Sequence, residues 1–209
     1  MKDKQTTFGF TIIELVVVIL IIGILASLSY GGYGRYRRNA ENSLKNDAAK
    51  ALAAGLKTYV GKNNEYPAKN TMTGEFGACL GNGPELEDGL CTNTTWAQVR
   101  SDFNAELEKI TKLSRFDYET KRLLVDNGDY FEGVVFIHRP SARVDGKYNK
   151  FFLEYALEGD NALCGEGVVK RNDANNYVST NQGYSFRGSG NTRCVIPLFD
   201  PDNPEALLP

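Results

Sequence analysis

The sequence has little of what enzymes and metal sites are usually built from. Its 209 residues include one histidine, four cysteines and one tryptophan. No Cys-x-x-Cys pair, phosphate-binding loop, dinucleotide fingerprint or zinc-protease motif occurs in it. The single histidine, His138, lies in an apparent strand, and no serine or cysteine motif frames it for a catalytic triad. We therefore predict a protein that is not an enzyme, with no catalytic residue, metal ion or cofactor.

An excess of charge of either sign is also missing. The chain holds 24 Lys and Arg against 26 Asp and Glu, a formal net charge of −2. Such a chain has no general electrostatic attraction for nucleic acid. One local group of basic residues has aromatic residues among and beside it: Arg139, Arg143, Lys147, Lys150, Lys170 and Arg171, with Tyr148, Phe151 and Phe152. A polyanion could bind such a group, but a solvated strand face is the simpler interpretation.

Carboxylates gather in residues 126–129 and 200–205. Oxygen ligands of this kind suit Ca²⁺, but neither group has the spacing of an EF-hand loop. Both groups also contain the asparagine, glycine or proline residues of ordinary turns. Turns are therefore the simpler explanation.

One long apolar run dominates the N-terminus. Residues 10–28 are 19 residues, which span ~28 Å as a helix, about the thickness of the hydrocarbon layer of a membrane. Their only charged side chain is Glu14. A carboxylate inside a membrane span costs roughly 2.5–3.5 kcal/mol, so Glu14 is a candidate functional residue.

The residues before this run do not fit an ordinary secretory signal, whose cleavage site follows an apolar core of roughly 7–15 residues. Here the small residue that could admit a peptidase, Gly9, precedes the core and follows a leader with Lys2 and Lys4. The stretch Phe8-Gly9-Phe10-Thr11-Ile12-Ile13-Glu14-Leu15 resembles the signal of type IV prepilins. The resemblance implies cleavage between Gly9 and Phe10 by a prepilin peptidase, methylation of the new amino terminus of Phe10, and a role for Glu14 in subunit assembly.

A physical argument supports that role for Glu14. After cleavage, the amine of Phe10 is a positive charge at the end of an apolar helix, and Glu14 is a negative charge within it. A subunit that enters a helical bundle can place its amine beside the Glu14 of a neighbour, so that each desolvated charge gains a partner. The alternative is that Glu14 lies among lipid headgroups and is simply solvated.

The orientation of the span is less clear from charge alone. Lys2 and Lys4 precede it, whereas Arg35, Arg37 and Arg38 follow it, so the positive-inside rule does not place the amino terminus in the cytoplasm. The prepilin-like signal does, because such signals are cleaved on the cytoplasmic side.

Helical periodicity continues beyond the membrane edge to residue 60. One apolar stripe recurs at three- and four-residue steps: Leu44, Ala48, Ala51, Leu52, Leu56, Tyr59 and Val60. Gly61, the Asn63-Asn64 pair and Pro67 then provide stop signals. Gly31, Gly32 and Gly34 interrupt the pattern, either as a point of local weakness or as small residues that pack between helices.

The rest of the chain predicts a globular head. We expect a second helix over residues 95–113, then three antiparallel strands that follow one another in order, with turns at 126–129 and 145–146. The strands are expected at residues 121–125, 130–138 and 151–157, with a short edge strand at 194–199 and loops over 68–95 and 159–190.

The four cysteines predict two disulfides, because an exported domain leaves the reducing cytosol. Three pairings are possible, and the sequence cannot choose among them. We favour Cys79 with Cys91 and Cys164 with Cys194, since each bridge then closes one loop-rich segment. Pilins often close their C-terminal region with such a bridge.

The expected fold is α+β and type IV pilin-like, with a long N-terminal helix packed on an antiparallel β-sheet and a disulfide-closed C-terminal loop region. Its parts are a cleaved leader (1–9), a membrane or filament-core half of the helix (10–30), an amphipathic half (31–61) and the head (62–209). The resemblance implies a pilus subunit that is a single-pass protein of the cytoplasmic membrane before assembly and lies in an extracellular filament afterwards. Its implied partners are further copies in a helical filament, other pilins, the prepilin peptidase, and the assembly platform with its ATPase.

Other functions stay open at this point. A pseudopilin of a type II secretion machine would carry the same signal, as would a minor or tip pilin that binds DNA or a receptor. A membrane-anchored enzyme ranks last. Motility, adhesion, DNA uptake and secretion are not distinguished by the residues.

Overall fold

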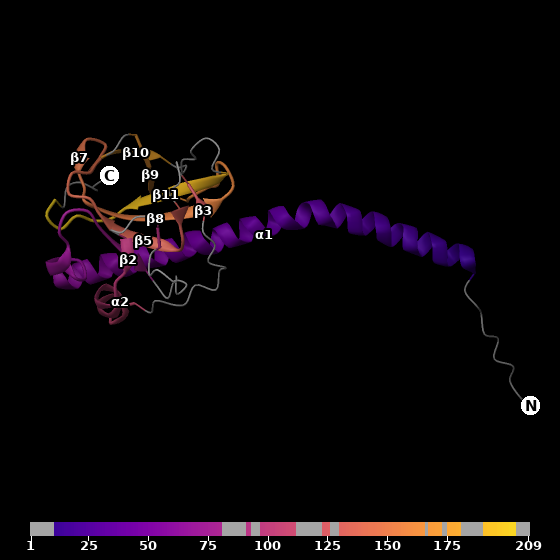
Figure 1. Ribbon diagram of the computed structural model, residues 1–209, viewed down its shortest axis with the longest axis horizontal. Helices are drawn as coiled ribbons and strands as arrows, with labels where there is room; N and C mark the ends of the chain where they lie inside the picture. Colours follow the sequence, from indigo (N-terminus) through magenta and orange to yellow (C-terminus); the bar gives the residue numbers. More distant parts are fainter. Residues whose placement is uncertain are drawn as a thin grey trace, which may run out of the picture. The chain divides into compact units, whose positions relative to one another are not determined.

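The computed structural model (Figure 1) describes most of the chain after the leader: residues 11–80, 91–92, 97–111, 123–125, 130–165, 167–172, 175–180 and 190–203. Residues 41–209 form one compact unit, and residues up to Ala40 form another. The long helix α1 (Ile12–Asn63) contributes to both units.

Helix α1 confirms the predicted long N-terminal helix and remains helical through Gly31, Gly32 and Gly34. It ends where Asn64 adopts a left-handed conformation, φ 55°, and donates its N–H to the carbonyl of Val60 at 2.7 Å. Asparagine tolerates this conformation better than most residues, which explains the stop. Gly61 lies within the helix and is not its cap.

Among the described residues, five strands form the larger sheet, and its neighbours are antiparallel except for one parallel pair, β1 with β2. In spatial order they are β11 (Asn191–Pro197), β8 (Phe151–Glu158), β5 (Val134–His138), β1 (Phe76–Leu80) and β2 (Ala97–Val99).

Smaller elements surround this sheet. Their bounds are η1 (Lys69–Thr71), α2 (Ser101–Glu108), β3 (Leu123–Leu124), β4 (Tyr130–Phe131), β6 (Arg143–Val144), β7 (Lys147–Tyr148), β9 (Val168–Arg171) and β10 (Asn176–Thr180). Within the described ranges, a four-stranded sheet has the order β7-β6-β10-β9, and β3 pairs with β4. Residues 41–63 of α1 cover one face of the larger sheet, and the four-stranded sheet lies over the other (Figure 1).

The core has two layers because β8 is buried on both faces. Leu153 and Tyr155 point toward α1, whereas Phe152 and Ala156 point toward the four-stranded sheet. A buried Leu or Phe side chain stabilises the fold by about 1.5–3 kcal/mol relative to an exposed one, so both layers hold β8 in place.

The predicted apolar stripe of α1 is correct in part. Leu52, Leu56 and Val60 are buried against the larger sheet, and Tyr59 is half-buried. Leu44 and Ala51 are exposed instead. The buried face is therefore rotated slightly from the one that the sequence pattern predicted.

The structure corrects several predicted elements of the head. Within the described part of the expected helix over residues 95–113, residues 101–108 form α2 and residues 97–99 form the edge strand β2 instead, while 95–96 and 112–113 lie outside the described residues. The expected loops over 68–95 and 159–190 contain β1, β9 and β10.

The three predicted strands pair antiparallel in sequence order as expected, but the middle one is divided into two. Gly133, with φ 79°, interrupts the expected strand at 130–138. Its first part, β4, pairs with β3, whereas its second part, β5, pairs with β8 and β1. The strand expected at 151–157 is confirmed as β8, and the turn at Asp145-Gly146 joins β6 to β7.

Even so, the architecture confirms the predicted α+β fold class. A long apolar N-terminal helix is followed by antiparallel-rich sheets, and two disulfides close loops of the head.

Candidate functional site

The part of α1 from Ile12 to Leu25 is an uncovered apolar surface. Its large apolar side chains from Ile12 to Leu25 have between 47% and 84% of their surface exposed. Helix α1 is long and apolar enough to cross a membrane. An apolar surface of this size in a folded protein indicates a membrane or a protein partner.

Glu14 is the only charged side chain in this surface between residues 12 and 27, and the structure shows what holds it. Its Oε2 accepts a hydrogen bond from the Thr11 backbone N–H at 2.9 Å and another from the Thr11 hydroxyl at 2.8 Å. In return, the Glu14 N–H donates to Thr11 Oγ1 at 3.3 Å. This reciprocal arrangement is a capping box, which satisfies backbone N–H groups that a helix start leaves without partners.

Thr11, which was not among the predicted site residues, is therefore the partner that positions the Glu14 carboxylate. The Thr-x-x-Glu spacing of Thr11 and Glu14 is a recognised sequence pattern of a helix start and could have revealed the cap. In the described part of the chain, no hydrogen bond to the other carboxylate oxygen, Oε1, is present. Glu14 thus caps its own helix with one carboxylate oxygen, Oε2.

The predicted cleavage and methylation positions, Gly9 and Phe10, lie outside the described residues. Processing at these two residues therefore stays a prediction from the sequence.

The four cysteines form two bridges in the head. Cys79 in β1 is joined to Cys91, with 5.8 Å between their Cα atoms. Cys164 is joined to Cys194 in β11, with 5.5 Å between Cα atoms. This is the sequential pairing among the three that were possible.

Four of the basic residues that were candidates for a polyanion site lie in strands of the four-stranded sheet: Arg143, Lys147, Lys170 and Arg171. Arg139 is buried with its Nη1 2.7 Å from Glu154 Oε1, and the interleaved Phe151 and Phe152 belong to the core. Lys150 pairs with Asp202 at 2.8 Å. Arg139 and Lys150 therefore each have an acidic partner within the head.

Arg139 belongs to a buried charged cluster with Glu154 and Arg193. Burial alone would lower the pKa of Arg139, but the charge of Glu154 outweighs it and leaves that pKa above its ordinary value. Burial would likewise raise the pKa of Glu154, but the two guanidinium groups hold it below its ordinary value. The cluster is charged and lies inside the core, so its role is structural.

His138 and the acidic groups show no metal site in the described ranges, where no group of three or more candidate ligands occurs. His138 is half-buried, with Nδ1 3.0 Å from the carbonyl of Gly74. Burial lowers the pKa of His138. The acidic residues 126–129 lie outside the described residues.

Comparison with known families yields one match. Residues 6–30 match the prokaryotic N-terminal methylation motif, which is the class III signal of type IV prepilin-like proteins. No curated protein and no solved structure matches the chain. The motif supports a pilin-like or pseudopilin-like protein.

Proposed function

We propose that this chain, which carries the class III signal of type IV prepilin-like proteins, is a structural subunit of a type IV pilus. The observation that carries the proposal is the uncovered apolar half of α1, whose only charge up to residue 27 is Glu14 and which the methylation motif overlaps. Such a helix needs lipid before assembly and the helices of other subunits afterwards.

In this proposal, a prepilin peptidase removes residues 1–9 and the amine of Phe10 becomes methylated. Residues 10–30 hold the subunit in the cytoplasmic membrane and later in the filament core. Residues 31–61 continue the helix, and residues 62–209 form the outward-facing head. Partners are other pilin subunits, the assembly platform and its ATPase.

Glu14 is the proposed assembly residue. Its Oε2 already accepts two bonds from Thr11, so Oε1 is the oxygen that the positive amine of a neighbouring Phe10 would approach. In a water-poor bundle, an ion pair of this kind is much more favourable than two isolated charges. If an incoming subunit is shifted along the filament axis, its Phe10 amine no longer meets the Glu14 of its neighbour, and both charges stay unpaired. The ion pair therefore favours one axial position of the subunit.

Glu14→Gln tests this role, because glutamine keeps the size of the side chain and an oxygen for the cap but removes the charge. We expect cleavage to be unchanged and the yield of sheared filaments to fall at least about tenfold, since one unpaired buried charge costs more than the 1.4 kcal/mol that corresponds to that factor. Glu14→Asp should retain part of the yield.

Ser27→Ala is the matched control in the same helix, because the Ser27 hydroxyl donates only to the nearby carbonyl of Ile24 at 2.8 Å. Its filament yield should equal that of the unaltered chain. A normal yield from Glu14→Gln would show that Glu14 serves only as a helix cap. Cleaved protein that stays in the membrane fraction in the unaltered strain would favour a pseudopilin instead.

A further inference from the structure

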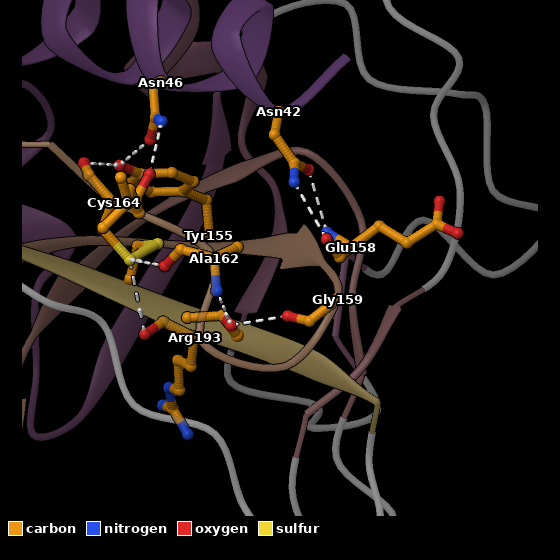
Figure 2. The surroundings of a disulfide bond; sticks show 11 residues. Asn42, Asn46, Tyr155, Glu158, Gly159, Ala162, Cys164 and Arg193 are labelled. Atoms are coloured by element: carbon orange, nitrogen blue, oxygen red, sulfur yellow. Dashed lines mark hydrogen bonds between the residues drawn. A yellow bond between two sulfur atoms is a disulfide. The ribbon is translucent and has the colours of Figure 1, made fainter. Parts of the chain in front are cut away.

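Two asparagine side chains of α1 reach the segment that ends in Cys164, and they occupy successive turns of the helix. Asn42 contacts Glu158 (Figure 2), and Asn46 contacts Leu163. One turn further along α1, Lys50 continues the same face, because its Cε lies 3.2 Å from where a Cβ on Gly165 would be. The face of α1 that carries residues 42, 46 and 50 thus lies along the segment from residue 158 to residue 165.

Asn42 completes the backbone hydrogen bonding of β8 at Glu158, beyond the point where β8 pairs with β5. Strand β8 pairs with β11 as far as Glu158, but its pairing with β5 stops at Tyr155. Beyond that point Asn42 Oδ1 accepts from the Glu158 N–H at 2.9 Å, and Asn42 Nδ2 donates to the Glu158 carbonyl at 2.9 Å. One amide side chain therefore makes the two bonds that a neighbouring strand would make.

Asn46 connects the turn to the core of the head. Its Nδ2 donates to the Leu163 carbonyl at 2.9 Å, while its Oδ1 lies 2.8 Å from the Tyr155 hydroxyl. That hydroxyl also lies 3.0 Å from the carbonyl of Cys164, and its one proton serves these two acceptors. Tyr155 is almost fully buried, which fixes the position of the hydroxyl.

Hydrogen bonds from β11 hold the other side of the turn. Ala162 donates its N–H to Thr192 Oγ1 at 2.8 Å, and the Thr192 hydroxyl donates to the carbonyl of Gly159 at 2.6 Å. None of these contacts, on either side, needs the bond between the two sulfur atoms.

We propose that Asn42, Asn46 and Tyr155 form a relay that docks residues 158–164 on α1 whether or not the Cys164–Cys194 bridge is closed. The relay places the Cys164 thiol beside Cys194 in the reduced chain, so that folding precedes and directs the formation of this disulfide. In this proposal, residues 158–164 reach their final position before oxidation. The Cys164–Cys194 bridge then stabilises a turn that has already formed.

Hydrogen exchange of backbone amides in the full chain, held in detergent micelles, tests the relay. The chains to compare are the unaltered protein, Cys164→Ser/Cys194→Ser, Asn42→Ala/Asn46→Ala, and all four changes together. Asn63→Ala is the matched control, since the Asn63 amide donates only to the Tyr59 carbonyl of its own helix at 3.0 Å. Amides in the centre of β8 report whether each variant is folded.

We expect loss of the bridge alone to leave the exchange of residues 158–164 within about tenfold of the unaltered chain. Adding the asparagine changes removes three hydrogen bonds of about 1 kcal/mol each, and the Tyr155 hydroxyl keeps the Cys164 carbonyl as its acceptor. We therefore expect exchange there to become at least about 30-fold faster. Equal exchange in Cys164→Ser/Cys194→Ser and in the fourfold variant would overturn the proposal.

Oxidative refolding of the reduced chain gives a second readout that does not need the fourfold variant to fold. Asn42→Ala/Asn46→Ala should slow closure of the Cys164–Cys194 bridge. Closure of the Cys79–Cys91 bridge should keep its rate, because neither Cys79 nor Cys91 lies in the segment that the relay docks. Equal slowing of both bridges, or of neither, would contradict the relay.

Discussion

Removing the charge of Glu154 is the perturbation to which the head should respond most strongly. Its side chain is fully buried between the two sheets, with Arg139 Nη1 2.7 Å from Oε1 and Arg193 Nη2 in contact with Oε2. Tyr177 of the four-stranded sheet also bonds to Arg139. Glu154→Gln keeps the shape but leaves two buried guanidinium groups without their shared negative charge.

The structure sets the size of this effect. Breaking a buried ion pair by removing one partner costs about 3–5 kcal/mol, a large part of the roughly 5–15 kcal/mol that stabilises a typical domain. Asp202→Asn makes the same chemical change at the exposed Lys150–Asp202 pair, where the aspartate side chain is 56% exposed. An exposed pair of this kind contributes about 0–1 kcal/mol, which makes Asp202→Asn the matched control.

Urea unfolding of the full chain in detergent, followed by tyrosine fluorescence or circular dichroism, measures both variants. The pKa of Glu154 is held below its ordinary value of 4.5, so its charge stabilises the fold above that pH, and this contribution is lost as the pH falls through the lowered pKa. Glu154→Gln should therefore be less stable at neutral pH and lose part of its acid sensitivity below pH 4.5. Equal destabilisation by Glu154→Gln and Asp202→Asn would refute the importance of the cluster.

Two further predictions concern packing and the C-terminal segment. A Cβ added by Gly61→Ala in α1 meets no atom within 4 Å, so this variant should raise the free energy of unfolding by roughly 0.5–1 kcal/mol. Gly55→Ala would place its Cβ 2.7 Å from Thr111 Cγ2. It should therefore be less stable than Gly61→Ala in thermal unfolding. Tyr66→Phe removes a 2.6 Å hydrogen bond to the Phe199 carbonyl and should lower the free energy of unfolding by about 1 kcal/mol. Amide exchange should become faster only in residues 198–203. An unchanged exchange rate there would show that Tyr66 does not anchor this segment.

The elements that could be predicted from the sequence are those with long or strongly apolar patterns. Helix α1 has a continuous apolar run followed by a helical stripe, and β8 is an eight-residue strand of mostly apolar and aromatic residues. In both, the local pattern and the final burial agree, so no information from distant residues is needed.

The elements that were missed depend on distant partners. Strand β1 is only five residues long and lies among glycines, yet β5 and β2 make it a central strand. Residues 97–99 continue a helical pattern, but pairing with β1 overrides that local preference. Periodicity within a short window cannot show such pairing.

The candidate site divides in the same way. Glu14 and its cap by Thr11 involve residues three positions apart, and their spacing can be recognised in the sequence. Asn42 and Glu158 are 116 positions apart, and nothing in the composition of either segment indicates that they meet. The N-terminal processing motif is thus predictable, whereas the contacts that hold the head on α1 are not.

Intact-mass spectrometry of filaments sheared from producing cells tests the central claim most directly. The account predicts an abundant species that begins at methylated Phe10 and is four hydrogens lighter than the reduced chain, because two disulfides are closed. A chain that still begins at Met1 and retains the leader through Gly9 would contradict the account.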